Sequence, residues 1–283
     1  MKKIIVFAAA LLLPLVGWSQ AQIETKKMKL SDFQQKVTKV VLTGNPLHDA
    51  YLKSSVAAIW NASPFEFCTM AEYNQLKSSD MNYFLLTTKG QFKNESEPGI
   101  SFLSLVKGGQ QAENGVSDML EVVSFPFASV EDASGREYVF LQAFLDVIQN
   151  YALASMEKDI NAYTGLANYT MNVSKSGGMT LVFSEGDLSS EVTAEVRQAC
   201  FDDAVLVLEE EAADEFMTPE QSNVLVSYVA VPAAKQPGSF CYKMLIDPQT
   251  NTLYYFRKHK ISKKFGAGFL AEDIKRITAP RKK

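Results

Sequence analysis

Residues 39–46 of this chain read Lys-Val-Val-Leu-Thr-Gly-Asn-Pro. The first five favour a β-strand. Asn45 followed by Pro46 is a typical helix start, because an Asn side chain caps free backbone N–H groups and Pro suits the first helical turn. Residues 47–60 then carry apolar side chains at helical spacing. The segment therefore predicts a strand that runs directly into a helix, the unit from which α/β folds are built.

The residues that follow extend this unit. Residues 65–68 favour a second strand, and Thr69 with Glu72 has the spacing of a capping box that opens a short helix. Strands separated by turn-rich stretches are predicted at 83–88, 100–106 and 119–125. One helix of two dozen residues or more is predicted from about Arg136 to Tyr163, from its apolar periodicity.

The rest of the chain repeats this order of elements. Strands are predicted at 179–183, 204–208, 224–231, 240–246 and 253–256, and helices at about 189–200 and 269–277, with a second capping box at Thr218 and Gln221. Gly44-Asn45 matches Gly186-Asp187 at the same point of the order. Both halves thus read β-α-β-α-β-β-β-α, a repeat of elements rather than of side chains.

These patterns predict an α/β fold (α+β mixed) with two similar halves, each a mixed sheet with packed helices. Strand–helix–strand units favour parallel pairing, whereas three consecutive strands favour antiparallel hairpins. The expected divisions are a signal peptide at 1–21, a first repeat with a long connecting helix at 22–165, and a second repeat at 166–283. Because no Pro/Ser-rich linker separates the repeats, we expect them to pack closely.

The amino terminus has the features of a cleavable export signal. Lys2 and Lys3 precede an apolar run over residues 4–18, and Ser19-Gln20-Ala21 suits a signal peptidase. Fifteen apolar residues fall short of the roughly 20 needed to cross a bilayer. The sequence therefore predicts an exported protein, periplasmic or secreted, with no transmembrane span after cleavage before Gln22.

The net charge of the mature chain limits the kinds of partner that it is expected to bind. Loss of Lys2 and Lys3 leaves 26 basic against 32 acidic residues, a net charge of −6 that argues against nucleic acid. Ten Lys or Arg residues nevertheless gather in 257–283. We expect a contact surface there for an envelope protein or another acidic surface, formed by Arg257, Lys258, Lys260, Lys263 and Lys264. The acidic run at 209–215 is interpreted as a solvated surface.

The sequence contains no recognisable catalytic motif. A nucleophilic site needs a positioned base, and neither His48 nor His259 lies near a Gly-x-Ser-x-Gly elbow. We interpret both as ordinary surface or capping histidines. Cys68, Cys200 and Cys241 are too few for a disulfide framework and are expected to be buried thiols. We therefore assign no catalytic residue, metal site or cofactor.

Two glycines are candidate positions for an anion site. Gly44 with Asn45, and Gly186, each follow a predicted strand and precede a predicted helix, where backbone N–H groups can hold an anion. Neither stretch is a phosphate-binding loop pattern. Helix capping by Asn45 and Asp187 is the competing interpretation.

Parts of the sequence and its order of elements resemble two groups of known proteins. Residues 40–44, 60–67 and 241–268 resemble a group of exported proteins of Bacteroides-type bacteria, which transfers no chemistry to this chain. The element order of each half is similar to the α/β module of TolB amino-terminal domains and curli-secretion-type envelope proteins. The strand–Asp-Pro-x-Thr–strand pattern in residues 241–256 resembles the hairpin of that module. The second resemblance implies a non-enzymatic assembly role, by analogy of fold.

Three functional hypotheses follow. The first is a non-catalytic exported module that acts through protein or cell-surface contacts. The second is a soluble binding protein that holds a small ligand between its halves, since such clefts commonly bind ligands. The third is an exported hydrolase with a catalytic acidic pair, which the sequence does not distinguish among its 32 acidic residues.

Overall fold

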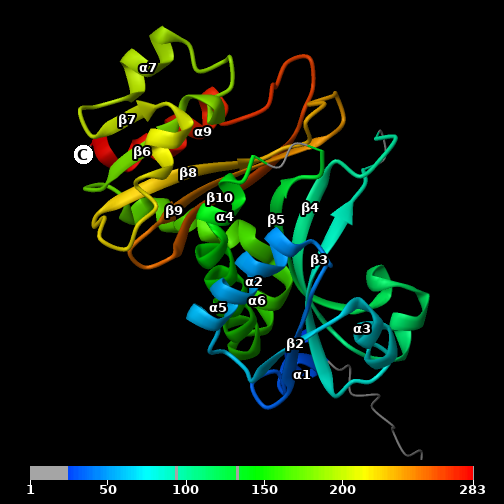
Figure 1. The fold of residues 1–283 in the computed structure, drawn as a ribbon. Helices are drawn as coiled ribbons and strands as arrows, with labels where there is room; N and C mark the ends of the chain where they lie inside the picture. The colour runs from blue at the N-terminus through cyan, green and yellow to red at the C-terminus, as the bar shows by residue number, and fades with distance from the viewer. Residues whose placement is uncertain (1–24, 93–94, 132–133, 283) are drawn as a thin grey trace, which may run out of the picture.

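Two five-stranded mixed sheets with packed helices form the fold, which is taken from a computed structural model (Figure 1). The structure describes residues 25–92, 95–131 and 134–282. Sheet A belongs to the first half of the chain and sheet B to the second. The predicted α/β fold class with two similar halves is therefore confirmed. The proposed signal at 1–21 lies outside the described residues.

The first half begins with a short helix and then builds sheet A. Its helices and strands are α1 (Lys26–Leu30), β1 (Val37–Val41), α2 (Pro46–Ile59), β2 (Phe65–Cys68), α3 (Met70–Leu76), β3 (Asn82–Gly90), β4 (Ile100–Lys107), the 3₁₀ turns η1 (Gln110–Asn114) and η2 (Val116–Asp118), β5 (Leu120–Ser129), α4 (Arg136–Val139), α5 (Leu141–Glu157) and α6 (Asp159–Thr164). The two sequence-predicted helix starts are confirmed, because Asn45 caps α2 and Thr69 with Glu72 forms the capping box of α3.

The second half builds sheet B. It consists of η3 (Gly165–Lys175), β6 (Thr180–Ser184), η4 (Glu185–Asp187), α7 (Ala194–Cys200), β7 (Val205–Leu208), α8 (Glu210–Asp214), β8 (Val224–Ala230), β9 (Phe240–Asp247), β10 (Thr252–Lys260), α9 (Ala271–Thr278) and η5 (Ala279–Lys282). The expected division between residues 165 and 166 falls one residue inside η3, which follows directly on α6.

The two sheets have the same strand order and the same strand directions. Sheet A runs β2-β1-β3-β4-β5, and sheet B, taken from its other side, runs β7-β6-β8-β9-β10. In each sheet the first three strands are parallel and the last two pairings are antiparallel. The strand–helix–strand units thus gave parallel pairs and the successive strands gave hairpins, as expected from the connection lengths.

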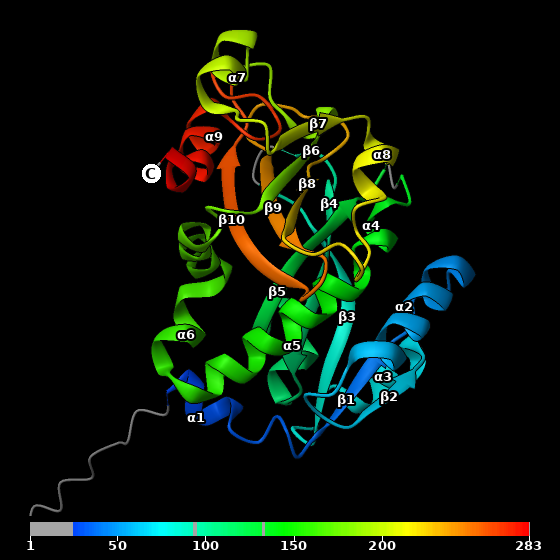
Figure 2. The same cartoon turned by 90° about the vertical axis from the view of Figure 1, so that its left-hand side faces the viewer.

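The sheets share one hydrophobic core, with α5 between them. Phe125 and Phe144 of the first half and Tyr228 and Met244 of the second lie in the same buried cluster. Separate clusters fill the outer faces, where α3 with η1 and η2 covers sheet A and α7 with α9 covers sheet B. Helices α7 and α9 accordingly lie at one end of the molecule and α1 and α3 at the other (Figures 1 and 2).

The connection between β9 and β10 is short, and one face of sheet B lies in the shared core. In the first half, the connection between β4 and β5 carries η1 and η2, which cover one face of sheet A. The equivalent connection in the second half is the turn 248–251, which is held by Asp247 through hydrogen bonds to Gln249 and Thr250. No helix is described between β9 and β10, and the corresponding face of sheet B packs against α5.

Three details of the predicted elements are wrong. The single helix at 136–163 is broken into α4, α5 and α6, with interruptions at Phe140 and Lys158. Lys158 adopts an extended backbone, whereas Phe140 keeps dihedral angles of the helical region. The helix expected from residue 189 begins only at Ala194, capped by Thr193. Residues 218–221 form a turn, and the second-half counterpart of α3 is α8, built from the acidic run. No helix within the described ranges is long and apolar enough to span a membrane.

Candidate functional site

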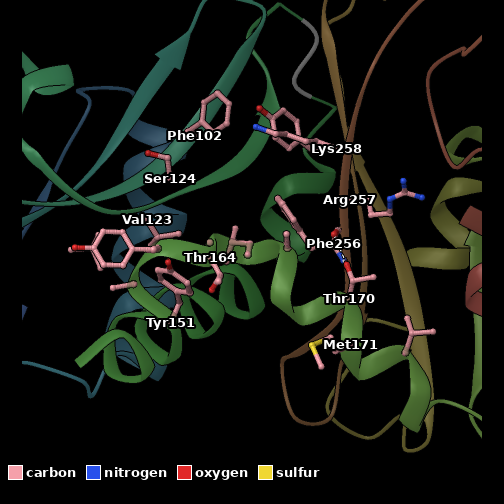
Figure 3. A pocket seen from close by; sticks show the side chains of 18 of the residues that line it. Phe102, Val123, Ser124, Tyr151, Thr164, Thr170, Met171, Phe256, Arg257 and Lys258 are labelled. Carbon is pink, nitrogen blue, oxygen red and sulfur yellow. Dashed lines mark hydrogen bonds between the residues drawn. The ribbon is translucent and has the colours of Figure 1, made fainter. Parts of the chain in front are cut away.

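A cleft of about 1000 Å³ lies between the two halves, beside the outer strand of each sheet. Figure 3 shows Val123 and Ser124 of β5 on one side of the cleft and Lys258 of β10 on the other. Thr164 and Met171 reach it from α6 and η3, the segments that join the halves. The cleft is therefore built from both halves at once.

Apolar and aromatic side chains form much of the cleft wall. They come from both sheets and from the connecting segment, and include Phe102, Val122, Val123, Tyr151, Leu166, Val173, Tyr242 and Phe256. Two further lining residues are strongly exposed, Tyr163 at 66% and Met171 at 77%. Exposed apolar side chains gathered beside a concave surface are typical of binding sites.

Basic residues outnumber acidic ones along the cleft. Lys26, Arg257, Lys258 and Arg276 line it, against the single carboxylate of Glu121 among the described lining residues. Burial lowers the pKa of Lys26, and the nearby Glu121 carboxylate opposes that shift. A concave surface with an excess of positive charge attracts anionic groups. The cleft thus has the electrostatic character of a site for an acidic ligand.

Arg257 is turned toward α9 rather than across the cleft (Figure 3). Its Nη1 lies 2.9 Å from Oδ1 of Asp273 and 3.1 Å from Oε1 of Glu272. Asp273 is fully buried and also accepts hydrogen bonds from Lys243 and Tyr255. These cationic and hydrogen-bonding partners lower the pKa of Asp273 despite its burial. The cluster fastens α9 to sheet B and leaves Lys26, Lys258 and Arg276 as the basic groups available to a ligand.

The segment η3 covers part of the outer edge of β10. The Thr170 hydroxyl donates to the carbonyl oxygen of Phe256 at 2.6 Å, and the Phe256 N–H donates back to Oγ1 of Thr170 at 3.3 Å. Asn172 donates from Nδ2 to the carbonyl oxygen of Leu253 at 3.0 Å. Side chains of η3 therefore take up backbone groups that an added strand would need on β10.

A buried ion-pair network fixes the halves against each other. Arg136, at the start of α4, donates to both carboxylate oxygens of Asp187 and through Nε to Asp214 at 2.8 Å. Its guanidinium also lies over the rings of Phe140 and Tyr228. Burial raises the pKa of Asp214 to about 6, because one arginine shared between two carboxylates does not fully offset desolvation.

The basic residues of the expected contact surface are divided by the structure. Arg257 and Lys258 line the cleft, whereas Lys260, Lys263 and Lys264 are not among its lining residues. Lys260 lies near the Phe240 ring and Lys264 near the Phe265 ring, at 5.9 and 5.0 Å from the ring centroids. A contact role for the three outer lysines stays a prediction.

The suggested anion positions are already served by the chain itself. Carboxylate oxygens of Asp49 accept from the backbone N–H of Thr43 and of Gly44, at 2.8 and 2.9 Å. The Asn45 side chain accepts from the first helical N–H groups of α2. Gly186 lies inside the 3₁₀ turn η4, the next helix, α7, begins only at Ala194, and the neighbouring Asp187 binds Arg136 instead of capping. Capping explains the first site and an ion pair explains the second.

The two histidines are less exposed than expected. His48 is a buried residue of α2, with its ring nitrogens 3.3 Å from the Tyr138 hydroxyl and 3.1 Å from the Thr87 hydroxyl. Burial lowers the pKa of His48. A smaller cavity of about 290 Å³ lies beside it, lined also by Lys89 and Glu137. The interpretation of His48 as an ordinary surface or capping histidine is wrong, because its ring is buried beneath Tyr138 of α4 and bonded to side-chain hydroxyls.

Sequence reasoning missed the pairing of Cys241 with His259. These residues face each other across β9 and β10, a juxtaposition that only strand register reveals. Burial raises the pKa of the Cys241 thiol to about 11 and lowers the pKa of His259. Both shifts oppose the thiolate–imidazolium pair that a cysteine nucleophile requires. Cys68, Cys200 and Cys241 are buried free thiols, as expected.

The search for metal-ligand clusters and the comparisons with known proteins identified no further functional feature among the described residues. In the described part of the chain, no three His, Cys, Asp or Glu side chains gather as metal ligands. Comparison of the chain with protein-family models, curated proteins and solved structures gave no match. The two resemblances drawn from the sequence therefore stay predictions.

Proposed function

We propose that this protein is a non-catalytic binding protein that holds an acidic ligand with apolar groups in the cleft between its halves. The observation that carries the proposal is the cleft itself, an apolar wall with three unpaired basic residues, Lys26, Lys258 and Arg276, against Glu121 as the one acidic residue among the described lining residues. Its volume of about 1000 Å³ matches the upper range of ligand sites, and such sites favour the junction between packed units.

The alternative of a hydrolase gains no support from this cleft. Hydrolysis of a glycosidic bond uses two carboxyl groups on opposite sides of the scissile bond. Glu121 is the one carboxylate among the described residues that line the cleft. The second sequence-based hypothesis, a ligand between the halves, is therefore the one that the geometry favours.

Native mass spectrometry of the protein recovered from its own host tests the proposal. We expect a mass above that of the chain, with the excess lost on denaturation. The double variant Lys258→Glu and Arg276→Glu reverses two exposed charges of the cleft and should lose the excess mass. A wild-type protein that carries no bound mass, and whose melting temperature does not respond to acidic host metabolites or peptides, would refute the proposal.

The matched control is Lys263→Glu with Lys264→Glu. It makes the same charge change on residues that do not line the cleft. This control should retain the ligand. It also tests the contact surface, since loss of an envelope partner from this variant alone would support a role of the outer lysines in contacts.

A further inference from the structure

Consecutive residues of β5 line the cleft, and this determines how the cleft meets sheet A. Glu121, Val122, Val123 and Ser124 are all lining residues. Successive side chains of a strand point to opposite faces of its sheet. In β5 this alternation is broken by a shift in its register with β4 between Glu121 and Val123, so four residues in a row can line one cavity beside this outermost strand of sheet A. The edge of sheet A therefore opens into the cleft.

This edge of β5 has free hydrogen-bonding capacity. β5 is the outermost strand of sheet A and pairs with β4 alone. Within the described ranges, no backbone or side-chain hydrogen bond from any segment except β4 reaches the backbone of residues 121–124. An unpaired strand edge presents N–H and C=O groups on which a further strand can form.

The free edge has a defined end. Pro126 has no N–H to donate, and the carbonyl oxygen of Phe127 accepts a hydrogen bond from the Tyr228 hydroxyl at 2.5 Å. The part of β5 that both lines the cleft and has a free edge is therefore residues 121–124. At about 3.4 Å per residue it spans roughly 14 Å, enough for a strand of four residues.

We propose that the ligand of the cleft is an extended acidic peptide segment that adds to sheet A as a further strand along β5. This inference rests on the proposed binding function and specifies its ligand class. Main-chain hydrogen bonds to β5 supply affinity in such complexes, while pockets for alternate side chains supply specificity. On the opposite wall, side chains of η3 already bond to backbone groups of β10. The added strand is therefore placed along β5.

The side chains around β5 select the chemistry of the peptide. Lys26, Lys258 and Arg276 form no ion pair with another described residue, and all three line the cleft. Acidic side chains of a bound strand would complete these charges. The apolar groups of Val122, Tyr151 and Phe256 would take its alternate side chains. An acidic segment with apolar residues at every second position fits both features.

Selection from a random decapeptide library by messenger-RNA display, with the purified protein immobilised, tests this inference. We expect enriched peptides with excess Asp and Glu and with apolar residues at every second position. Methylation of single backbone nitrogens should weaken binding at least tenfold at alternate positions and less than twofold at the positions between them. This alternation arises because only every second N–H of an added strand faces its partner.

Charge reversal links the selected peptides to the cleft. Lys258→Glu with Arg276→Glu should weaken their binding at least tenfold, and the Lys263→Glu, Lys264→Glu control should change it less than twofold. No enriched acidic family, methylation effects without alternation, or equal binding to the cleft variant would overturn the inference. If native mass spectrometry nevertheless finds a bound small acid, the binding function stands and only the peptide assignment fails.

Discussion

The guanidinium of Arg136 bonds both carboxylate oxygens of Asp187 across the junction of the two halves, at 2.9 and 3.1 Å. Arg136 belongs to the first half and Asp187 follows the first strand of the second half. The Ser227 hydroxyl, 2.5 Å from Oδ2 of Asp187, completes the site. Because planar bidentate pairs fix orientation as well as distance, this contact sets how the sheets that bound the cleft face each other.

Removal of this arginine should strongly destabilise the protein. Arg136→Met leaves Asp187 and Asp214 without their buried partner, and breaking a buried pair costs about 3–5 kcal/mol. Urea unfolding measures the loss. The control is Arg197→Met, whose partner Glu185 has a half-exposed side chain, with an expected cost of about 0–1 kcal/mol. Equal small losses in both variants would contradict the prediction.

Asp214 should make stability decrease as the pH rises through the weakly acidic range. Its pKa is raised to about 6, chiefly by burial, from an ordinary value of 3.8. Between these values the folded chain retains a proton that the unfolded chain has lost, so deprotonation favours unfolding. At 1.36 kcal/mol per pKa unit, this contribution falls by about 3 kcal/mol from pH 4 to pH 7.

Unfolding free energies of Asp214→Asn at several pH values test this dependence. The variant should lack the decrease between pH 4 and pH 7 that the parent protein shows. Glu215→Gln, a change at an adjacent exposed residue, should keep it. A parent protein whose stability rises steadily over this range, with the same slope in Asp214→Asn, would refute the assignment.

Asp273 should be essential for the attachment of α9. Asp273→Asn leaves Lys243, a residue only 1% exposed, without its charged partner. The expected loss is about 3–5 kcal/mol in the free energy of unfolding. Its neighbour Glu272 has a largely exposed side chain, so Glu272→Gln should cost no more than about 1 kcal/mol. Similar stabilities of the two variants would show that the buried cluster is not what fastens α9.

The thiol of Cys241 should be inert in the folded protein. With a pKa of about 11, only about one thiol in a thousand is ionised at pH 8, and Cys241 is fully buried. A thiol reagent such as dithiobis-nitrobenzoate should leave the folded protein unlabelled over minutes and react with three thiols after urea is added. Rapid labelling of Cys241 before unfolding would contradict this prediction.

Local signals sufficed for most of the fold. The start of α2 was predictable because Asn45 and Pro46 act on backbone groups within one helical turn. The same holds for the Thr69–Glu72 capping box of α3. Strands were predictable from runs of β-branched and aromatic residues, and their direction from the length of each connection. These features depend on neighbours in the chain.

Local signals failed where a distant contact decides. Apolar periodicity continued through Phe140, so one helix was predicted where α4 and α5 lie. Phe140 is fully buried against Tyr228 of sheet B. This contact cannot be predicted from the sequence around Phe140. Likewise, Asp187 had the spacing of a cap, but Arg136 from the other half binds it.

Some of the residues that line the cleft could be identified from the sequence and others could not. The excess of basic residues in 257–283 was visible in the sequence, but Lys26, Glu121 and Tyr151 had no signal that joined them to it. Most elements, their order and the repeat could be predicted from the sequence, because these follow from interactions over a few residues. The enclosure of one cleft by the edges of β5 and β10 could not. That outcome depends on how α5 packs between two sheets, which is a balance of contacts between residues far apart in the chain.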